Sequence, residues 1–457
     1  MIAIHYDYVI VGAGSAGCVL ANRLSKTWST RVLIVESGPL DGSITMEMPL
    51  AFPLPLTNDR YNWAYYTEPE PHMNGRRMYC PRGRVLGGSS SINGMVWLRG
   101  NPLDYEHWAT RGLPEWSYGH CLPYFKRSES RARGGNHYRG DEGPMRISTG
   151  GCENPLHRTF VDAGLQAGYS FTDDMNGFQQ EGFGPKEMSV YRGRRWSAAR
   201  GYMDALRGRE NFKRELESTV LRLLSDGQRI VGVEYERMGI IQKVFAEKEV
   251  ILCAGAINSP QLLMLSGIGP AEHLKEHGVS LVAHLPGVGA GLRDHTDLYI
   301  QYQCIEPVSL YPATTKLGRA KTALQWLVTR SGPGASNQFE AGGFIRSRAG
   351  VEHPDLQFHF LPMAGNYDGS YLAPGHSFQV FLSLMRPTSH GSIQLHSRDP
   401  RAAPAIRFNL SSALYETREL GAAAAEAQSV VDDAEAPEEL RQRAHGLVTE
   451  IRRQMAT

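Results

Sequence analysis

Two short apolar runs near the N-terminus have the pattern of buried strands. Residues 8–11 and 32–35 are rich in β-branched side chains and carry no charge, which is typical of strands covered on both faces of a parallel sheet. Between them, Val19, Leu20 and Leu24 are spaced along one face of a helix. This order predicts a parallel βαβ unit at the start of an α/β domain.

A second group of strands is predicted in the middle of the chain. Residues 218–224, 230–236 and 244–247 have the pattern of a small strand meander. Residues 250–253 form another short apolar run, which we expect to rejoin the parallel sheet. Residues 104–127 have a helical pattern.

Apolar and polar positions alternate in the second half of the chain. The alternation covers residues 356–360, 378–380 and 393–396. A period of two indicates strands with one covered face. We therefore predict an antiparallel sheet in this part of the chain.

Composition and charge narrow the class of protein. The chain has 457 residues, with 48 Lys and Arg against 47 Asp and Glu and a formal net charge of +1. This balance argues against a nucleic-acid-binding protein, which carries a basic excess. No run approaches the ~18 apolar residues of a membrane helix, and no secretory signal is visible. The six cysteines are scattered without a CxxC pair, so we expect no disulfide framework, no metal site and a cytoplasmic protein.

The turn between the first strand and the first helix carries a glycine motif. Gly12, Gly14 and Gly17 form GxGxxG, whose glycines permit the turn, the approach of a pyrophosphate and close packing of helix on strand. The helix N-terminus offers free N–H groups to phosphate. Glu36 ends the second strand, where a carboxylate accepts hydrogen bonds from a ribose. The motif predicts a dinucleotide site but does not distinguish FAD from NAD.

Two later segments also indicate a binding site. Residues 82–94 are so rich in Gly and Ser that we interpret them as a loop whose backbone N–H groups line an anionic or polar group. Residues 251–255 form a buried strand, and Ser259 and Pro260 predict the start of a helix after it. We expect strand, turn and helix to follow one another here.

With these segments the chain resembles the glucose-methanol-choline oxidoreductases, which are FAD-dependent enzymes that oxidise alcohols. Residues 83–106 match the first signature of that family, and residues 255–269 match the second. The resemblance implies an α/β fold with a discontinuous, Rossmann-like FAD-binding domain. It also implies an α+β substrate domain whose antiparallel sheet roofs the flavin.

The resemblance also divides the chain into domains. It implies an FAD-binding domain in residues 1–155 and 192–300. A substrate domain would comprise residues 156–191 and 301–410. Residues 411–457 would form a divergent helical tail.

Further segments resemble the choline-oxidising branch of the family. They lie outside the general signatures, at residues 61–65, 70–74, 308–313, 334–346, 358–362 and 366–367. The resemblance implies oxidation of choline to betaine aldehyde, a step of glycine betaine biosynthesis, by hydride transfer to N5 of the flavin. Another small primary alcohol is the alternative substrate.

The family places FAD along the two glycine-rich turns. The residues implied at the cofactor are Gly12, Gly14, Gly17, Glu36, Gly87, Gly88, Ser89, Asn93, Gly94, Met95, Val96 and Val220. For Val220, an ordinary place in a core strand is the alternative. Some relatives attach the flavin through a histidine of the first signature. That position is Ile92 here, so we expect non-covalent FAD.

A choline substrate would require aromatic faces and a carboxylate, because its quaternary ammonium has no N–H to donate. The candidates are Glu340, Trp63 and Tyr367, with Tyr65, Trp326 and Phe339 as further aromatic residues. Core packing is the alternative for each aromatic residue, and a salt bridge is the alternative for Glu340. His295, in a family-like Asp294–His295 pair, is expected to be structural.

The electron acceptor implied by this branch is a quinone or another component of the respiratory chain. Such an acceptor would allow peripheral contact with the inner membrane, although nothing in the composition shows it. A nucleic-acid partner is not expected.

The resemblance stops near residue 410. Family members carry, near their end, a histidine and then a second His or Asn that act as the base, and we find no such segment in residues 411–457. The only histidine there, His445, lies in an amphipathic helical pattern and is expected on a helix surface. We therefore identify no catalytic residue. Two explanations stay open: a truncated or frame-shifted chain that binds flavin without turnover, or helices that replace the closing segment.

Overall fold

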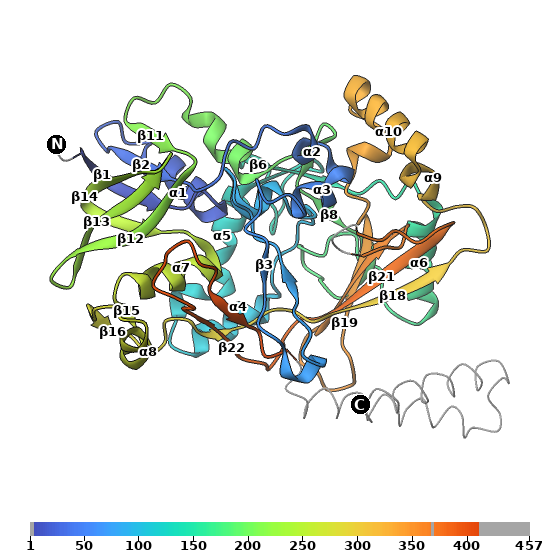
Figure 1. The fold of residues 1–457 in the computed structure, drawn as a ribbon. Coiled ribbons are helices and arrows are strands. Elements are labelled where there is room, and N and C mark those ends of the chain that lie inside the picture. Colours follow the sequence, from blue (N-terminus) through green and yellow to red (C-terminus); the bar gives the residue numbers. More distant parts are fainter. Residues whose placement is uncertain (1–3, 367–369, 411–457) are drawn as a thin grey trace.

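The computed structural model describes residues 4–366 and 370–410, and these residues are organised around two β-sheets (Figure 1). A six-stranded sheet contains the N-terminal strand, and a five-stranded sheet lies at the opposite end of the molecule. The predicted fold class, a largely parallel sheet with helices and a separate antiparallel sheet, is confirmed. The expectations for residues 411–457 and for Tyr367 lie outside the described residues.

The six-stranded sheet has the order β11-β2-β1-β14-β13-β12. Its strands are β1 (Ile4–Val11), β2 (Val32–Val35), β11 (Phe212–Glu215), β12 (Ser218–Asp226), β13 (Arg229–Arg237) and β14 (Ile240–Leu252). The first four strands in that order are parallel, and β13 and β12 extend the sheet in antiparallel fashion. The 13 residues of β14 pair first with β13 and then with β1. The last strand of the predicted meander and the run that rejoins the parallel sheet are therefore parts of one strand.

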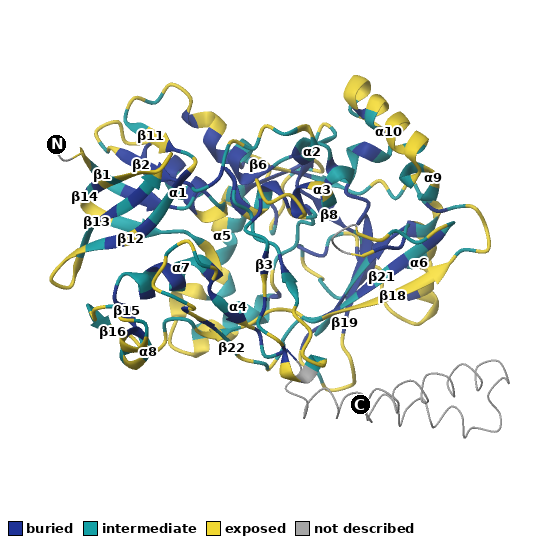
Figure 2. Ribbon diagram, viewed as in Figure 1, coloured by how far each residue is buried: buried dark blue, intermediate teal, exposed yellow. Residues whose placement is uncertain are grey.

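Helices cover both faces of this sheet. Ile10 and Ile34 pack with α1 (Ser15–Leu24), whereas Val9 and Leu33 pack with the side of the sheet that α7 (Gly255–Leu265) covers. All four residues of β2 and the last three residues of β1 are buried, whereas the antiparallel end of the sheet is partly exposed (Figure 2). Such double coverage explains why β1 and β2 are apolar at successive positions.

The predicted start of α7 at Ser259 and Pro260 is wrong. The helix begins at Gly255, and Pro260 lies inside it. Gly255 has a φ of +86°, a conformation that glycine adopts readily, so the chain turns from β14 directly into the helix. The helix therefore starts before the capping signal that we used.

The five-stranded sheet is antiparallel and has the order β18-β21-β20-β19-β7. Its strands are β7 (Gly182–Pro185), β18 (Asp297–Gln303), β19 (Ala341–Ile345), β20 (Leu356–Leu361) and β21 (Ser377–Leu384). The predicted strands at 356–360 and 378–380 are confirmed as parts of β20 and β21. Residues 393 and 394 fall in β22 (Gly391–Gln394), but that strand pairs with β17 (Ala290–Leu292) and β23 (Ala405–Arg407) in a separate sheet. Alternation indicates a covered face but does not identify the neighbouring strand.

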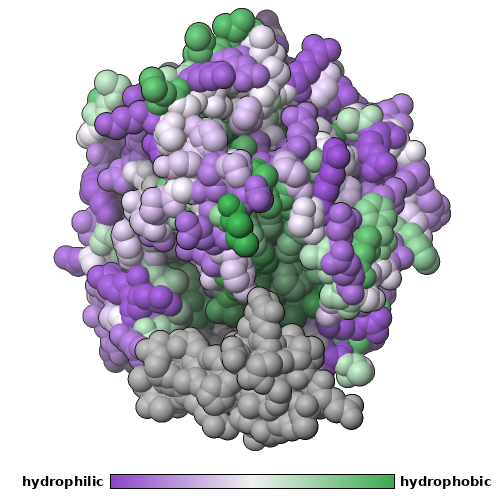
Figure 3. All heavy atoms as spheres, turned by 90° about the vertical axis from the view of Figure 1, so that its right-hand side faces the viewer, coloured by the Kyte–Doolittle hydropathy of each residue, from purple (hydrophilic) through white to green (hydrophobic). Residues whose placement is uncertain are grey.

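The two faces of the five-stranded sheet have different neighbours. Phe381 packs with Ile92 and Met95 of the glycine-rich loop, whereas Phe378 packs on the face covered by α6 (Pro155–Gln166). All seven residues of the edge strand β18 are exposed. Figure 3 views this end of the molecule and shows apolar side chains gathered in a hollow between mostly polar surroundings.

Short elements complete the described residues. The other α-helices are α2 (Ile44–Glu47), α3 (Pro53–Leu56), α4 (Pro102–Thr110), α5 (Tyr118–Ser128), α8 (Ala271–Glu276), α9 (Tyr311–Thr314) and α10 (Lys316–Thr329). The other strands are β3 (Tyr65–Tyr66), β4 (Tyr79–Cys80), β5 (Glu129–Arg131), β6 (Met145–Thr149), β8 (Glu187–Met188), β9 (Val190–Tyr191), β10 (Arg194–Arg195), β15 (Ile268–Gly269) and β16 (Ala283–His284). Helices α4 and α5 confirm the helical pattern predicted for residues 104–127. Within the described part of the chain, no helix has the length and apolar character needed to cross a membrane.

Candidate functional site

The three glycines of the first turn have three different surroundings. A Cβ at Gly12 would lie 2.6 Å from the carbonyl oxygen of Cys253, and a Cβ at Gly17 would lie 2.0 Å from the carbonyl oxygen of Gly12. Gly12 also has a φ of +95°. A Cβ at Gly14 would meet nothing closer than 4.0 Å. Gly12 and Gly17 are therefore required by the fold, whereas Gly14 borders open space.

That space belongs to a cleft of about 700 Å³ beside the ends of β1, β2 and β14. Open α/β sheets bind ligands at the carboxyl ends of their strands. The predicted residues that line the cleft are Gly12, Gly14, Glu36, Trp63, Tyr65, Gly88, Ser89 and Val220. The predicted residues that do not line it are Gly17, Gly87, Asn93, Gly94, Met95, Val96 and Glu340.

Glu36 lies next to the end of β2 with only 6% of its surface exposed. Its Oε2 accepts the N–H of Ala13 at 2.8 Å, and its Oε1 accepts the N–H of Gly38 at 2.9 Å. Burial raises the pKa of Glu36 to about 7, and these N–H groups and Arg84 oppose that rise. A carboxylate oxygen has more than one acceptor position, so Glu36 can still receive a ribose hydroxyl from the cleft.

Arg84 is a cleft residue that we did not predict. Its guanidinium lies 5.4 Å from the ring centre of Trp63, which stacks on Tyr65. Its Nε is buried without a hydrogen-bond partner among the described residues. An unused cationic donor in a glycine-lined cleft fits an anionic group such as a pyrophosphate. The only signal in the sequence was a basic residue three positions before the double glycine.

The second glycine-rich loop packs directly against the first. Gly87 and Gly88 have φ values of +89° and +55°, and a Cβ at Gly88 would lie 2.7 Å from the Cα of Gly14. The Oγ of Ser89 accepts the N–H of Gly83 at 3.1 Å. The close contact of the two loops therefore requires glycine at position 88, whereas a Cβ at Gly14 would not meet the second loop.

Arg195, which we also did not predict, holds the far end of this loop. It is 2% exposed, and its guanidinium donates to the carbonyl oxygen of Asn93 at 2.6 Å and to the Oδ1 of Asn93 at 2.9 Å. The same Oδ1 accepts the N–H of Met95, which has a φ of +59°. Asn337 donates to the carbonyl oxygen of Gly94 at 2.7 Å. The Asn93–Val96 segment is thus fixed by side chains from distant parts of the chain.

The candidate substrate residues do not gather in one place. Trp63 lines the dinucleotide cleft. Glu340 is 6% exposed, and its carboxylate accepts the N–H of Cys152 at 2.6 Å and the hydroxyl of Ser336. The preceding residue, Phe339, packs with the glycine-rich loop instead. The two neighbouring side chains thus have different surroundings, and Phe339 rather than Glu340 contacts the loop.

Aromatic rings line the face of the five-stranded sheet that meets this loop. A Cβ at Gly94 would lie 3.5 Å from the ring of Phe339. Phe339 contacts Phe381 with ring centres 5.6 Å apart, and His359 lies edge-on to Phe339 at 6.1 Å. Asp294 pairs with Arg82 of the cleft at 3.7 Å. The cleft and this aromatic face are therefore adjoining parts of one candidate site.

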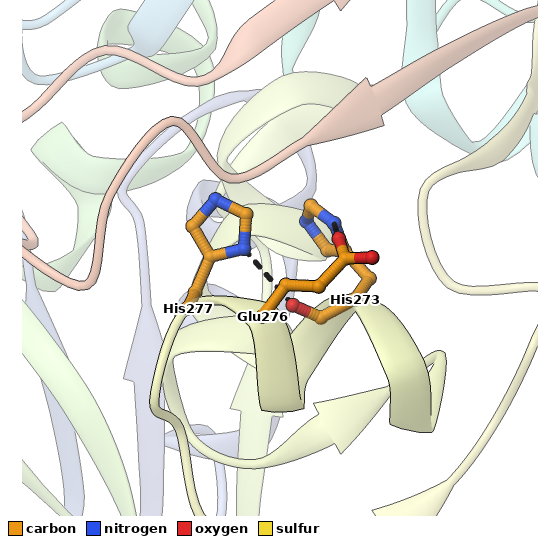
Figure 4. A group of neighbouring side chains, drawn as sticks. All are labelled: His273, Glu276 and His277. Carbon is orange, nitrogen blue, oxygen red and sulfur yellow. Dashed lines mark hydrogen bonds and ion pairs between the residues drawn. The ribbon is translucent and has the colours of Figure 1, made fainter.

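His273, Glu276 and His277 form a cluster whose ligand atoms lie within 4.8 Å of one another (Figure 4). The Nε2 of His273 accepts the N–H of Leu395 at 2.9 Å, so the proton of the neutral ring is on Nδ1. A metal ion on Nδ1 would have to displace that proton. The Nδ1 of His277 bonds the carbonyl oxygen of His273 at 2.9 Å. These bonds assign the cluster a structural role between α8 and the residue after β22.

The comparisons with known proteins agree with this geometry. Residues 6–297 match the family model described as GMC oxidoreductase. The chain is 52% identical over 412 residues to the oxygen-dependent choline dehydrogenase of Chromohalobacter salexigens, and the match covers 89% of this chain and 74% of that protein.

Solved structures show the same fold. Pyridoxine 4-oxidase from Mesorbium loti matches with a TM-score of 0.80 and 29% identity, covering 90% of this chain and 78% of that one. A formate oxidase variant from Aspergillus oryzae RIB40, solved to study modification of its FAD, matches with a TM-score of 0.82 and 27% identity over the same shares. The predicted family resemblance is confirmed.

Proposed function

We propose that this chain, which belongs to the GMC oxidoreductase family, oxidises choline to betaine aldehyde with FAD as its cofactor. The observation that carries the proposal is the 52% identity to an oxygen-dependent choline dehydrogenase over 412 residues. The cleft supports the cofactor, because its glycines, its acidic Glu36 and the Nε of Arg84, which has no hydrogen-bond partner among the described residues, suit a dinucleotide.

The residues of the cleft have distinct proposed roles toward FAD. Gly12, Gly14 and Gly17 would admit the pyrophosphate, Glu36 would bind the adenosine ribose, and Val220 would lie at the adenine. Arg84 would donate to the phosphate oxygens. We propose that the cofactor is held without a covalent bond, because the apolar side chain of Ile92 is 1% exposed and offers no nucleophile.

The Gly87–Val96 loop would carry the reactive ring of the cofactor. FAD held there would supply the acceptor, at N5, for a hydride from the carbon that bears the substrate hydroxyl. Arg195 and Asn337 hold this loop through its carbonyl oxygens, which limits its movement during the reaction. Phe339 and Phe381 exclude water from the substrate side and present aromatic edges and faces.

The substrate cation would need aromatic and acidic neighbours. Glu340, Trp63 and Tyr367 remain the candidates from the sequence. Phe339, a further aromatic candidate from the sequence, lies beside the loop, and the structure adds Phe381 next to it. Removing the ring of Phe339 should weaken choline binding more than removing the ring of Trp63, because Trp63 lies in the dinucleotide cleft.

We propose a quinone or another respiratory-chain component as the acceptor, with peripheral contact to the inner membrane where that acceptor lies. Dioxygen is the alternative acceptor, which the name of the choline dehydrogenase relative favours. Oxygen uptake measured against quinone reduction, with choline as donor, separates the two.

Anaerobic titration with choline tests the proposed function. We expect choline to bleach the visible absorbance of the bound oxidised flavin, with betaine aldehyde formed in equal amount. Pyridoxine is the comparison alcohol, because a pyridoxine 4-oxidase shares the fold. Bleaching by pyridoxine but not choline would overturn the substrate. Flavin that no alcohol bleaches would instead indicate a flavin-binding protein without turnover.

A further inference from the structure

Lys186 is a buried lysine in an unusual position. It lies between β7 and β8 and is 1% exposed. It takes part in none of the ion pairs found within residues 4–366 and 370–410. A Cβ at Gly342 would lie 2.7 Å from the Cδ of Lys186, so this glycine leaves the space that the lysine stem occupies. A buried amine without a carboxylate partner calls for a specific explanation.

The partners of Lys186 are a carbonyl group and an imidazole. Its Nζ donates to the carbonyl oxygen of Phe358 at 2.9 Å and lies 2.6 Å from the Nδ1 of His359. Two positive charges at that separation would repel strongly, so the two groups hold at most one excess proton between them. Nδ1 is engaged with the amine, which leaves Nε2 as the free nitrogen of the ring.

His359 lies on the face of the five-stranded sheet that meets the Gly87–Val96 loop. It pairs across the sheet with Gly342 and with Phe381, and Phe381 packs with Met95 of that loop. Phe339 meets the ring of His359 edge-on. The free nitrogen of His359 therefore belongs to the same face as the aromatic residues of the candidate site.

Charged groups near Lys186 and His359 shift the pKa values of these two residues, some upward and some downward. Burial lowers the pKa of Lys186 well below its usual range, and Asp297 of β18 only partly opposes this effect. Burial also lowers the pKa of His359, with further lowering by Lys186 and by His295 before β18. The pKa of Asp297 is itself raised, mainly by burial; Asp294 raises it further and His295 lowers it. The next residue, Glu187, is engaged with Arg131 and Arg139.

We propose that Lys186 is a positioning residue for His359: it holds Nδ1, directs Nε2 toward the substrate side of the flavin, and limits the positive charge beside a cationic substrate. This inference rests on the proposed oxidation of choline. If Lys186 and His359 share an added proton, their positive charge would repel the quaternary ammonium of choline. Uptake of this proton should therefore weaken the binding of choline but not the binding of an uncharged alcohol of the same shape.

Two substrates and two variants of the flavin-loaded enzyme test the proposal. Choline is compared across pH with 3,3-dimethylbutan-1-ol, in which carbon replaces the charged nitrogen. In the wild type we expect kcat/KM for choline to fall about tenfold relative to the neutral alcohol as the pair takes up a proton. K186Q and K186M should shift this relative loss to lower pH, because only the less basic His359 remains.

The two variants differ in positioning. The amide of K186Q can still donate to Nδ1, so the neutral alcohol should keep its rate within about threefold, whereas K186M should lose about tenfold to a hundredfold. Wild-type rates and pH dependence in K186M would overturn the proposal. Equal losses in both variants with an unchanged choline-to-alcohol ratio would indicate a merely structural lysine and would also overturn it.

A readout that does not need turnover separates this inference from the proposed function. Imidazole ¹⁵N shifts, assigned to His359 by their loss in H359N, should show one tautomer in the wild type and K186Q but mixed tautomers in K186M. Identical signatures in all three proteins would overturn the proposal. If the wild type oxidises neither alcohol, the proposed function fails, and these shifts still decide the role of Lys186.

Discussion

Lys186 and Glu187 are neighbours in the chain, but they belong to two buried clusters of opposite design. Glu187 accepts from Arg131 at 2.6 Å and from Arg139 at 2.5 Å. Arg139 also bonds Glu129 and Asp174. Lys186, on the other side of the backbone, meets a carbonyl oxygen and an imidazole. One cluster neutralises its cations with carboxylates, and in the other no carboxylate from the described part of the chain forms an ion pair with the lysine.

The electrostatic consequences differ in the same way. Burial alone would raise the pKa of Glu129, but hydrogen bonds and charges from Arg139 and Arg99 outweigh it and lower the pKa. The pKa of Arg139 rises because of Glu129 and Glu187, against burial. In the Lys186 cluster, burial is the largest effect on the lysine and lowers its pKa. Carboxylates keep the buried cations of the first cluster charged, whereas the buried amine of Lys186 lies beside the candidate site without such compensation.

Replacing Arg139 by Met breaks the paired cluster and should have the largest effect. Glu129, Asp174 and Glu187 would lose a cation while Glu129 stays fully buried, which should cost about 3–5 kcal/mol of unfolding free energy. Urea denaturation measures the loss. The exposed Arg133, 3.9 Å from Asp173, is the matched control and should lose less than about 1 kcal/mol. Similar losses for both arginines would contradict the comparison.

Replacing Lys186 by Met should have the opposite sign. Exchanging the buried amine for an apolar group of similar volume should raise the unfolding free energy near pH 7 by about 1–4 kcal/mol. The unfolded chain protonates Lys186 below about pH 10.4 whereas the folded state resists, so wild-type stability rises with pH and the advantage of the variant shrinks toward that pH. Urea denaturation at several pH values tests this expectation.

The control for that prediction is Lys213, which is exposed and ion-paired with Glu215. Its replacement by Met should slightly lower stability or leave it unchanged, with no gain near neutral pH. Loss of stability in the Lys186 variant near pH 7 would show that the amine contributes more through its hydrogen bonds than its burial costs.

Glu36 extends the comparison to a buried carboxylate without an ion pair in the described structure. Its pKa is raised to about 7, so the folded protein binds a proton more tightly than the unfolded chain between about pH 4.3 and pH 7. The stability of the flavin-free protein should therefore fall as pH rises through this window, by on the order of 1–3 kcal/mol. Glu36→Gln should remove that slope, and an unchanged slope would rule out Glu36 as its source.

Arg84 is the cation that we expect to form an ion pair with the phosphate groups of the cofactor. Replacing it by Met should weaken FAD binding about tenfold, since a hydrogen bond to a charged group is lost, and should leave the stability of the flavin-free protein nearly unchanged. Equilibrium dialysis of FAD measures the affinity. Arg207, an exposed residue paired with Asp204, is the control. An equal loss of FAD affinity in both variants would show that Arg84 is not part of the FAD-binding site.

The sequence predicted the parts of the site that depend on local backbone geometry. Gly12, Gly14 and Glu36 were predicted because a strand, a turn and a helix require particular residues at fixed spacing, and the structure places all three in the cleft. Whether they bind FAD remains a prediction. The two sheets were predicted in type because apolar periodicity reports which faces are covered.

The parts that were not predicted depend on contacts between distant segments. Lys186 and His359 are 173 positions apart, and Arg195 and Asn93 are 102 apart, so nothing in either neighbourhood indicates the partner. Glu340 was selected for its charge, but its carboxylate accepts the N–H of Cys152, a residue 188 positions away. Trp63 was selected as an aromatic residue, and its place in the dinucleotide cleft depends on the position of β3.

The pairing of β1 with β14 has a consequence for biosynthesis. β1 begins at Ile4, whereas the partner on its other side ends at Leu252. At about 5–20 residues per second, a ribosome needs on the order of ten to fifty seconds to make the intervening chain. During that interval the edge of β1 that pairs with β14 has no strand beside it, and the side of the glycine turn that packs on Cys253 is uncovered. We expect nascent chains that end before β14 to depend on chaperones and to take up no flavin, so the cofactor can join only after more than half of the polypeptide has been made.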